Sequence, residues 1–142
     1  LYPEVAPITV ENFVNLIKKN FFDGLIFHRV IPGFMIQGGG YDTDMKEHPA
    51  ASIKGEFASN GVTNNLKHTR GVLSMARTMV KDSASSQFFI MHADAPHLDG
   101  DYAAFGLITE GLEEVDKIAN VKRSPWNDMP NEPQVIKTMK LL

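Results

Sequence analysis

Two stretches of the chain repeat apolar residues at the spacing of an amphipathic helix. In residues 9–20, four of them lie at i, i+3, i+4 and i+7 and form a single stripe: Val10, Phe13, Val14 and Ile17. Thr9 is the expected N-cap, because its hydroxyl can accept a hydrogen bond from a free amide of the first turn. The second helix is predicted over residues 112–120, directly after Gly111.

Most of the remaining chain consists of short apolar runs separated by glycine, asparagine and aspartate, a pattern typical of strands. Strands are predicted at residues 25–31, 34–37, 71–76, 87–92, 103–108 and 134–142. Residues 38–40, 58–68 and 124–133 are expected to be loops. Many strands with only two isolated helices favour a mainly β barrel or sandwich closed by helices over an alternating α/β fold.

Composition narrows the class of protein. The chain has 142 residues, of which 43% are hydrophobic and 22% charged, as expected for one globular domain. No apolar run approaches the roughly 20 residues that a membrane helix needs. The net charge is -3 and no large basic cluster is present, which argues against a nucleic-acid partner and, with the short apolar runs, leaves no sign of a membrane partner.

The chain contains no cysteine, which excludes disulfides, thiolate zinc sites and a cysteine nucleophile. Absence of cysteine fits a reducing compartment, so a cytoplasmic location is expected. The five histidines lack the spacing of common metal sites, and no metal or cofactor is expected. The serines Ser85 and Ser86, near His92 and Asp94, are not surrounded by a nucleophile elbow, which argues against a serine hydrolase.

Two strands carry polar residues where an apolar one would be ordinary. Arg29 lies in an apolar strand, where its charge is costly unless it faces a partner or an open cleft. Alternation places His28 on the opposite face. In residues 87–91, Phe88 and Ile90 share an apolar face, whereas Gln87 shares its face with large apolar residues, as in a ligand pocket. Taken alone, Arg29 could equally be a surface residue of an edge strand, and a lone stretch such as residues 87–91 is usually a half-exposed strand.

Together these segments resemble the cyclophilin family of peptidyl-prolyl cis–trans isomerases. The resemblance covers nearly the whole chain and includes an ungapped signature, Phe-His-Arg-Val-Ile-Pro-Gly-Phe-Met-Ile-Gln-Gly, at residues 27–38. Further matches lie at residues 7–13, 71–76, 86–90, 98–100 and 105–106. The resemblance implies a single domain over residues 1–142 that catalyses rotation about Xaa-Pro bonds in peptides and in unfolded or folding proteins.

The resemblance also assigns the site. Arg29 matches the catalytic arginine and Gln37 the glutamine beside it, with Phe34 as the third residue placed at the centre of catalysis. The proline pocket is completed by Met35, Phe89 and Leu98. The adjoining groove, which holds the residues before proline, matches Ala76, Arg77 and Gln87, and the family uses the backbone of the residue at Arg77.

Two rim positions depart from the best-known eukaryotic pattern. His97 stands where a tryptophan often lies, and Tyr102 where a histidine does. Isomerisation is expected to survive both changes. The tryptophan helps to secure the cyclic peptide cyclosporin, so His97 predicts weak cyclosporin binding.

The implied fold is a closed eight-stranded antiparallel barrel capped by two α-helices. The match begins at Leu1-Tyr2-Pro3, which in the family follows the first two strands. The N-terminal hairpin is therefore expected to be missing, and the barrel incomplete, with unpaired strand edges exposed. The main alternative function is a proline-peptide binding or chaperone-like module with little turnover. Retention of Arg29, Gln37 and the apolar wall favours the enzyme.

Overall fold

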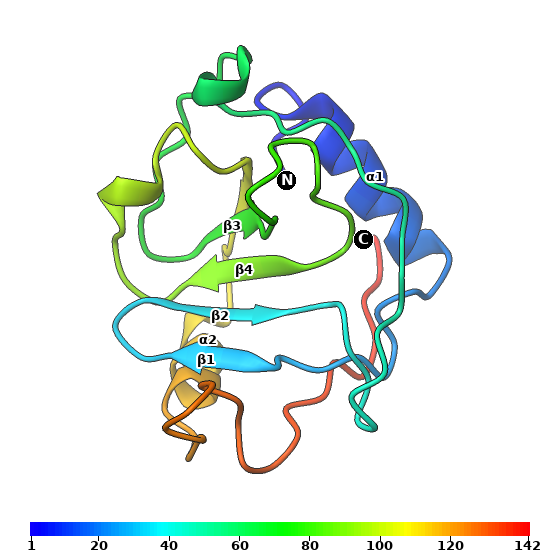
Figure 1. Cartoon of the computed structure of the whole chain (residues 1–142), viewed down its shortest axis with the longest axis vertical. Helices are drawn as coiled ribbons and strands as arrows, with labels where there is room; N and C mark the ends of the chain where they lie inside the picture. The colour runs from blue at the N-terminus through cyan, green and yellow to red at the C-terminus, as the bar shows by residue number, and fades with distance from the viewer.

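Five short strands form one antiparallel sheet in the order β1-β2-β4-β3-β5, with β1 and β5 at its two edges (Figure 1). A computed structural model describes all 142 residues. The strands are β1 (Arg29–Ile31), β2 (Met35–Gly38), β3 (Val72–Met75), β4 (Phe88–Met91) and β5 (Ala104–Leu107). The helices are α1 (Pro7–Lys18) and α2 (Leu112–Ala119), and single 3-10 turns lie at η1 (Ala58–Asn60) and η2 (Pro96–Leu98).

Alternation along each strand divides the sheet into two faces. In β4, Phe88 and Ile90 join the larger core, whereas Phe89 and Met91 join a smaller apolar cluster on the opposite face. The other strands divide in the same way, so the face pattern predicted for residues 87–91 is confirmed. The smaller cluster lies on the face that carries the pocket described below.

Both helices contribute to the larger core, which places them on the same face of the sheet. Figure 1 shows α1 running along one side of the sheet and α2 lying behind β1 and β2. Helix α2 begins at Leu112 as predicted, after Gly111 with a φ of 94°. Helix α1 is confirmed as a helix, but it begins at Pro7, whose fixed φ suits a first helical position.

The earlier start of α1 means that Thr9 is not its N-cap. Thr9 is fully buried, and both its backbone N–H (2.6 Å) and its hydroxyl (2.8 Å) donate to Oε1 of Glu56. Glu56 is itself only 2% exposed. The threonine therefore ties the helix to the segment before η1, and the expected capping role was wrong.

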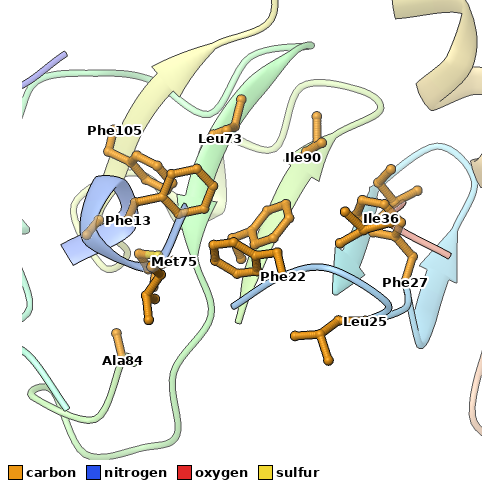
Figure 2. Close-up of a cluster of buried hydrophobic side chains, with 14 of the residues drawn as sticks. Phe13, Phe22, Leu25, Phe27, Ile36, Leu73, Met75, Ala84, Ile90 and Phe105 are labelled. Atoms are coloured by element: carbon orange, nitrogen blue, oxygen red, sulfur yellow. The ribbon is translucent and has the colours of Figure 1, made fainter. Parts of the chain in front are cut away.

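The larger core is built around packed phenylalanines. The Phe88 ring meets Phe13, Phe22 and Phe27 edge-on, at centroid distances of 5.4, 5.6 and 5.9 Å. Figure 2 shows Phe13 of α1 and Phe105 of β5 on one side of this cluster, with Phe22 and Leu25 from the chain before β1 on the other. Edge-to-face rings are favoured by their quadrupoles and join α1, the sheet and the segment at residues 21–27.

The closed eight-stranded barrel expected from the resemblance is not what the structure shows. The sheet has five strands and does not close, because β1 and β5 each have only one neighbour. The strand predicted at residues 25–31 is regular only from Arg29. The strand predicted at residues 134–142 makes a single bridge, from Val135 to Ile26.

Backbone hydrogen bonds pair part of residues 25–31 with part of residues 134–142. Ile136 N–H donates to Leu25 O (2.7 Å) and Phe27 N–H donates to Gln134 O (2.9 Å). Residues 137–142 make no backbone hydrogen bond, although Met139 packs against the larger core. None of the helices is long and apolar enough to cross a membrane.

Candidate functional site

A pocket opens on the face of the sheet opposite the helices. The β1–β2 hairpin, the end of β3, β4 and the chain around η2 all contribute to it. Its lining residues are Arg29, Phe34, Met35, Gln37, Ala76, Arg77, Phe89, Leu98 and Tyr102. The structure therefore brings together nine of the eleven side chains that the sequence nominated.

The other two nominated residues lie beside this pocket. Gln87 lines an adjoining hollow together with Glu47, Thr78, Ser83 and Ser85, and this hollow shares Gln37, Ala76 and Arg77 with the pocket. His97 lies at the rim, where its ring packs against Phe34 at a centroid distance of 5.8 Å. Both positions fit the predicted groove and rim.

Strand pairing sets Arg29 beside its amide neighbour. Arg29 and Gln37 are direct cross-strand partners in the β1–β2 pair, so their side chains rise on the same face. The Gln37 amide nitrogen donates to Oε1 of Gln87 at 3.0 Å, which fixes the orientation of the Gln37 side chain. Arg29 is exposed and forms no ion pair with any carboxylate of the chain, so its guanidinium donors face the pocket free of a competing charge.

The neighbouring histidine does not add a second charge to the site. His28 packs against Tyr41 at a centroid distance of 4.8 Å. Burial, and then the positive charge of Arg29, lower the pKa of His28 below its ordinary value. The imidazole is therefore neutral at neutral pH, and Arg29 supplies the positive charge on this strand.

Arg77 acts through its side chain as well as its backbone, which the resemblance did not imply. Its guanidinium lies 4.7 Å from the Phe57 ring centroid and 4.8 Å from that of Tyr102. Its donors reach the carbonyl oxygen of Asp101 (2.7 and 3.0 Å) and that of Thr78 (2.9 Å). Arg77 thus holds Tyr102, whose ring meets Phe89 edge-on, at the rim of the pocket.

A buried polar network that the sequence analysis missed lies behind Phe89. His68 stacks on the Phe89 ring, at 6.0 Å and an interplanar angle of 19°. Its Nδ1 is 2.9 Å from Oδ1 of Asp99, and its Nε2 is 2.8 Å from the Ser74 hydroxyl. Ser74, His68 and Asp99 are hydrogen-bonded in the same series as a Ser-His-Asp triad. Ser74 is fully buried, however, and no substrate can reach it. The network supports the pocket wall.

This network predicts a pH-dependent stability. Burial lowers the pKa of His68 below its ordinary value of 6.5, although hydrogen bonding to Asp99 opposes the shift. Below that pH the unfolded chain binds a proton that the folded chain excludes, so acidification favours unfolding. We expect the free energy of unfolding to fall by up to about 1.4 kcal/mol per pH unit from this group. Urea denaturation at pH 7.5, 6.5 and 5.5 measures it.

The matched control is His68→Gln, which keeps polar atoms but cannot titrate. Its stability is expected to be lower at pH 7.5 and to depend less on pH between 7.5 and 5.5. An identical pH slope in the wild type and in His68→Gln would show that another group is responsible, with His28 the first to examine because its pKa is lowered too.

The remaining polar residues considered from sequence have other partners. The Ser86 hydroxyl is buried and donates to the Gly39 carbonyl oxygen at 2.8 Å. His92 contacts Asp116 (3.0 Å), and Asp94 accepts from the backbone of Arg70 (2.9 Å), so no catalytic triad forms with Ser85 or Ser86. No group of three or more His, Asp or Glu side chains gathers as a metal site.

Comparisons with known proteins agree with this geometry. Residues 1–141 match the family model described as cyclophilin type peptidyl-prolyl cis-trans isomerase/CLD. A peptidyl-prolyl cis-trans isomerase of Acinetobacter baylyi is 53% identical over 140 residues, which cover 94% of this chain and 72% of that protein. Peptidyl-prolyl cis-trans isomerase B of Bacillus subtilis is 48% identical and covers 84% of this chain and 80% of its own length.

A solved structure has the same fold. A cyclophilin type isomerase of Cryptosporidium parvum, crystallised in the presence of the dipeptide Ala-Pro, superimposes with a TM-score of 0.81 at 28% identity. The match covers 97% of this chain and 87% of that one. From the signature strand, the pocket and these relatives, the chain belongs to the cyclophilin family of peptidyl-prolyl cis–trans isomerases.

Proposed function

We propose that the pocket binds the proline ring of an Xaa-Pro peptide and that Arg29 donates the catalytic hydrogen bond. The observation that carries this assignment is the free Arg29 guanidinium at the edge of a pocket whose other walls are mainly apolar. An unpaired cation beside apolar walls suits a substrate that is apolar at its ring and polar at its amide.

Cis–trans isomerisation of an Xaa-Pro bond breaks no covalent bond. Resonance gives the Xaa-Pro amide a rotation barrier of about 18–20 kcal/mol, and uncatalysed exchange takes tens to hundreds of seconds. As the amide twists, its nitrogen loses conjugation and its lone pair becomes able to accept a hydrogen bond. Arg29, permanently charged and geometrically fixed, favours that twisted amide over both planar forms. Selective stabilisation of the twisted state is what raises the rate.

The other residues of the site hold different parts of the substrate. Phe34, Met35, Phe89 and Leu98 grip the pyrrolidine ring while the preceding carbonyl swings, and Gln37 orients the amide beside Arg29. Ala76, Arg77 and Gln87 border the hollow that receives the residues before proline, with His97 and Tyr102 at the rim. Support comes from the crystallisation of the Cryptosporidium parvum relative with Ala-Pro.

The substrates on this proposal are proline-containing peptides and unfolded or folding proteins. The pocket recognises the proline ring and the adjoining hollow is open, so many sequences before proline are accepted. The assigned steps use only side chains of the chain itself. A cytoplasmic location stays a prediction from the composition.

The test is NMR exchange spectroscopy of a short Ala-Pro peptide with a catalytic amount of the protein. We expect cis–trans exchange to rise from the uncatalysed range of tens of seconds to many events per second. Signals of the pocket residues should shift as peptide is added. Shifts in the pocket without faster exchange would contradict the proposal and favour the binding module.

Weak cyclosporin binding gives a separate prediction. The His97 ring contacts Phe34 at the rim, and a tryptophan there would add apolar area and an N–H donor. His97→Trp is expected to strengthen cyclosporin binding by about tenfold, equivalent to about 1.4 kcal/mol. Isothermal titration calorimetry measures this affinity, with His48→Trp, outside the pocket lining, as the control. Equal affinities in wild type and His97→Trp would contradict the role of this position.

A further inference from the structure

The turn between β1 and β2 places Phe34 in the wall of the pocket. Phe34 N–H donates to Ile31 O at 3.0 Å, with Pro32 and Gly33 at the corner of the turn. Gly33 has a φ of 78°, which favours glycine, and it is exposed to solvent. A turn of four residues exposed at its tip does not fix Phe34 alone, so contacts from outside the turn decide where this ring lies.

His97 packs on the Phe34 ring, and His92 holds the backbone of the turn. Gly33 N–H donates to Nδ1 of His92 at 2.8 Å. The backbone N–H of His92 donates to Phe34 O at 2.9 Å, which ties the same residue to the turn a second time. A backbone N–H can only donate, so Nδ1 must be the unprotonated, accepting nitrogen of the ring. The ring proton is therefore on Nε2.

The other side of the imidazole is anchored on α2. Its Nε2 lies 3.0 Å from Oδ1 of Asp116. Arg70 holds that carboxylate with two hydrogen bonds of 2.7 and 2.9 Å, and it also donates to His92 O at 2.9 Å. The hydrogen bond from Arg70 lowers the pKa of Asp116, which keeps the carboxylate ionised. The histidine ring is thus held in one orientation and one tautomer.

We propose that His92 is a positioning residue for isomerisation: neutral and anchored on Asp116, it holds the turn so that Phe34 closes the wall of the proline pocket. This role rests on the proposed function of the pocket. His92 does not touch the substrate and acts only through the Gly33–Phe34 turn.

Two substitutions separate the positioning role from a general structural one. His92→Asn keeps an acceptor where Nδ1 was. His92→Leu removes the acceptor. We expect His92→Leu to raise KM by about fivefold, the worth of one hydrogen bond, with a smaller change in kcat. His92→Asn should stay within about twofold of wild type.

His48→Leu is the matched control, because His48 also pairs with a carboxylate, Asp42, at 2.8 Å but lies outside the pocket lining. It should leave KM unchanged. Equal losses of kcat/KM in His92→Asn and His92→Leu would overturn the proposal, as would an unchanged KM in His92→Leu.

A measurement on the wild type keeps the proposal testable if a variant does not fold. In NMR spectra of the wild type, the ring nitrogen shifts of His92 should show Nδ1 unprotonated and hydrogen-bonded, and the Gly33 amide should be protected from exchange with solvent. A proton on Nδ1, or an unprotected Gly33 amide, would overturn the positioning role. This readout needs no turnover, so it tests the proposal for His92 independently of catalysis. Failure of the proposed function would appear separately, as absence of catalysis by the wild type.

Discussion

Arg29→Ala is expected to lower kcat/KM for an Ala-Pro peptide by about 100- to 1000-fold. Loss of one donor that stabilises a transition state costs about 2.7–4 kcal/mol in comparable sites. Acceleration from minutes to milliseconds corresponds to an activation barrier that is lower by roughly 7 kcal/mol. Arg29 is therefore expected to contribute about half of this lowering. The apolar walls and the rest of the site remain, and a residual rate above the uncatalysed one should persist.

The loss should fall on kcat more than on KM, because Arg29 interacts with the twisted amide more strongly than with the planar one. Exchange spectroscopy at several peptide concentrations separates the two constants. The substitution should leave stability within about 0.5 kcal/mol, since the side chain is exposed and forms no ion pair.

Arg29→Lys tests whether a positive charge alone is sufficient. Lysine keeps the charge but presents a flexible, strongly hydrated ammonium in place of a rigid fork, so an intermediate rate is expected. If Arg29→Ala loses less than about threefold, the hydrogen bond proposed for the twisted amide is not what drives the reaction.

Phe88→Ala is expected to have the largest effect on stability. The Phe88 side chain is 1% exposed and lies against three other rings, those of Phe13, Phe22 and Phe27. Its removal leaves a cavity where helix α1, the sheet and the chain before β1 meet. Truncation of a buried phenylalanine costs about 3–5 kcal/mol, a large share of a total stability of about 5–15 kcal/mol.

Urea denaturation followed by circular dichroism measures this loss. Phe21→Ala is the matched control, because Phe21 is half-buried and packs against Phe22 at 5.4 Å from outside the cluster. It should lose less than half as much. Equal losses in the two variants would mean that the cluster around Phe88 is not the centre of the core.

The pocket residues were assigned by the resemblance, because the ungapped signature at residues 27–38 and the shorter matches name them one by one. Alternation along the strands added only which face some of them share, with Arg29 expected opposite His28. In the structure, four of the nine lining residues lie on strands: Arg29, Met35, Gln37 and Phe89. The other five come from turns and loops, whose positions no alternation predicts.

Strand ends and sheet closure could not be predicted in the same way. Residues 134–142 contain the short apolar runs of a predicted strand, yet only the part beside residues 24–27 finds backbone partners. Apolar alternation reports which face of a segment is buried. Whether a segment becomes a strand depends on a second segment lying within hydrogen-bonding distance, and no local pattern encodes that.

The supports behind the pocket depend on contacts between distant parts of the chain. His68 meets Asp99 across 31 residues, and Arg70 meets Asp116 across 46. Arg77 could be recognised from its neighbours as a groove residue, but its place between Phe57 and Tyr102 depends on where two loops lie. Alternation thus allowed the faces of the strands to be read from residue order, and the resemblance supplied the walls of the pocket. The tautomer of His92, the burial of His68 and the anchoring of the Phe34 turn follow from the packing of those distant segments, because hydrogen bonds and desolvation depend on distances in the folded chain.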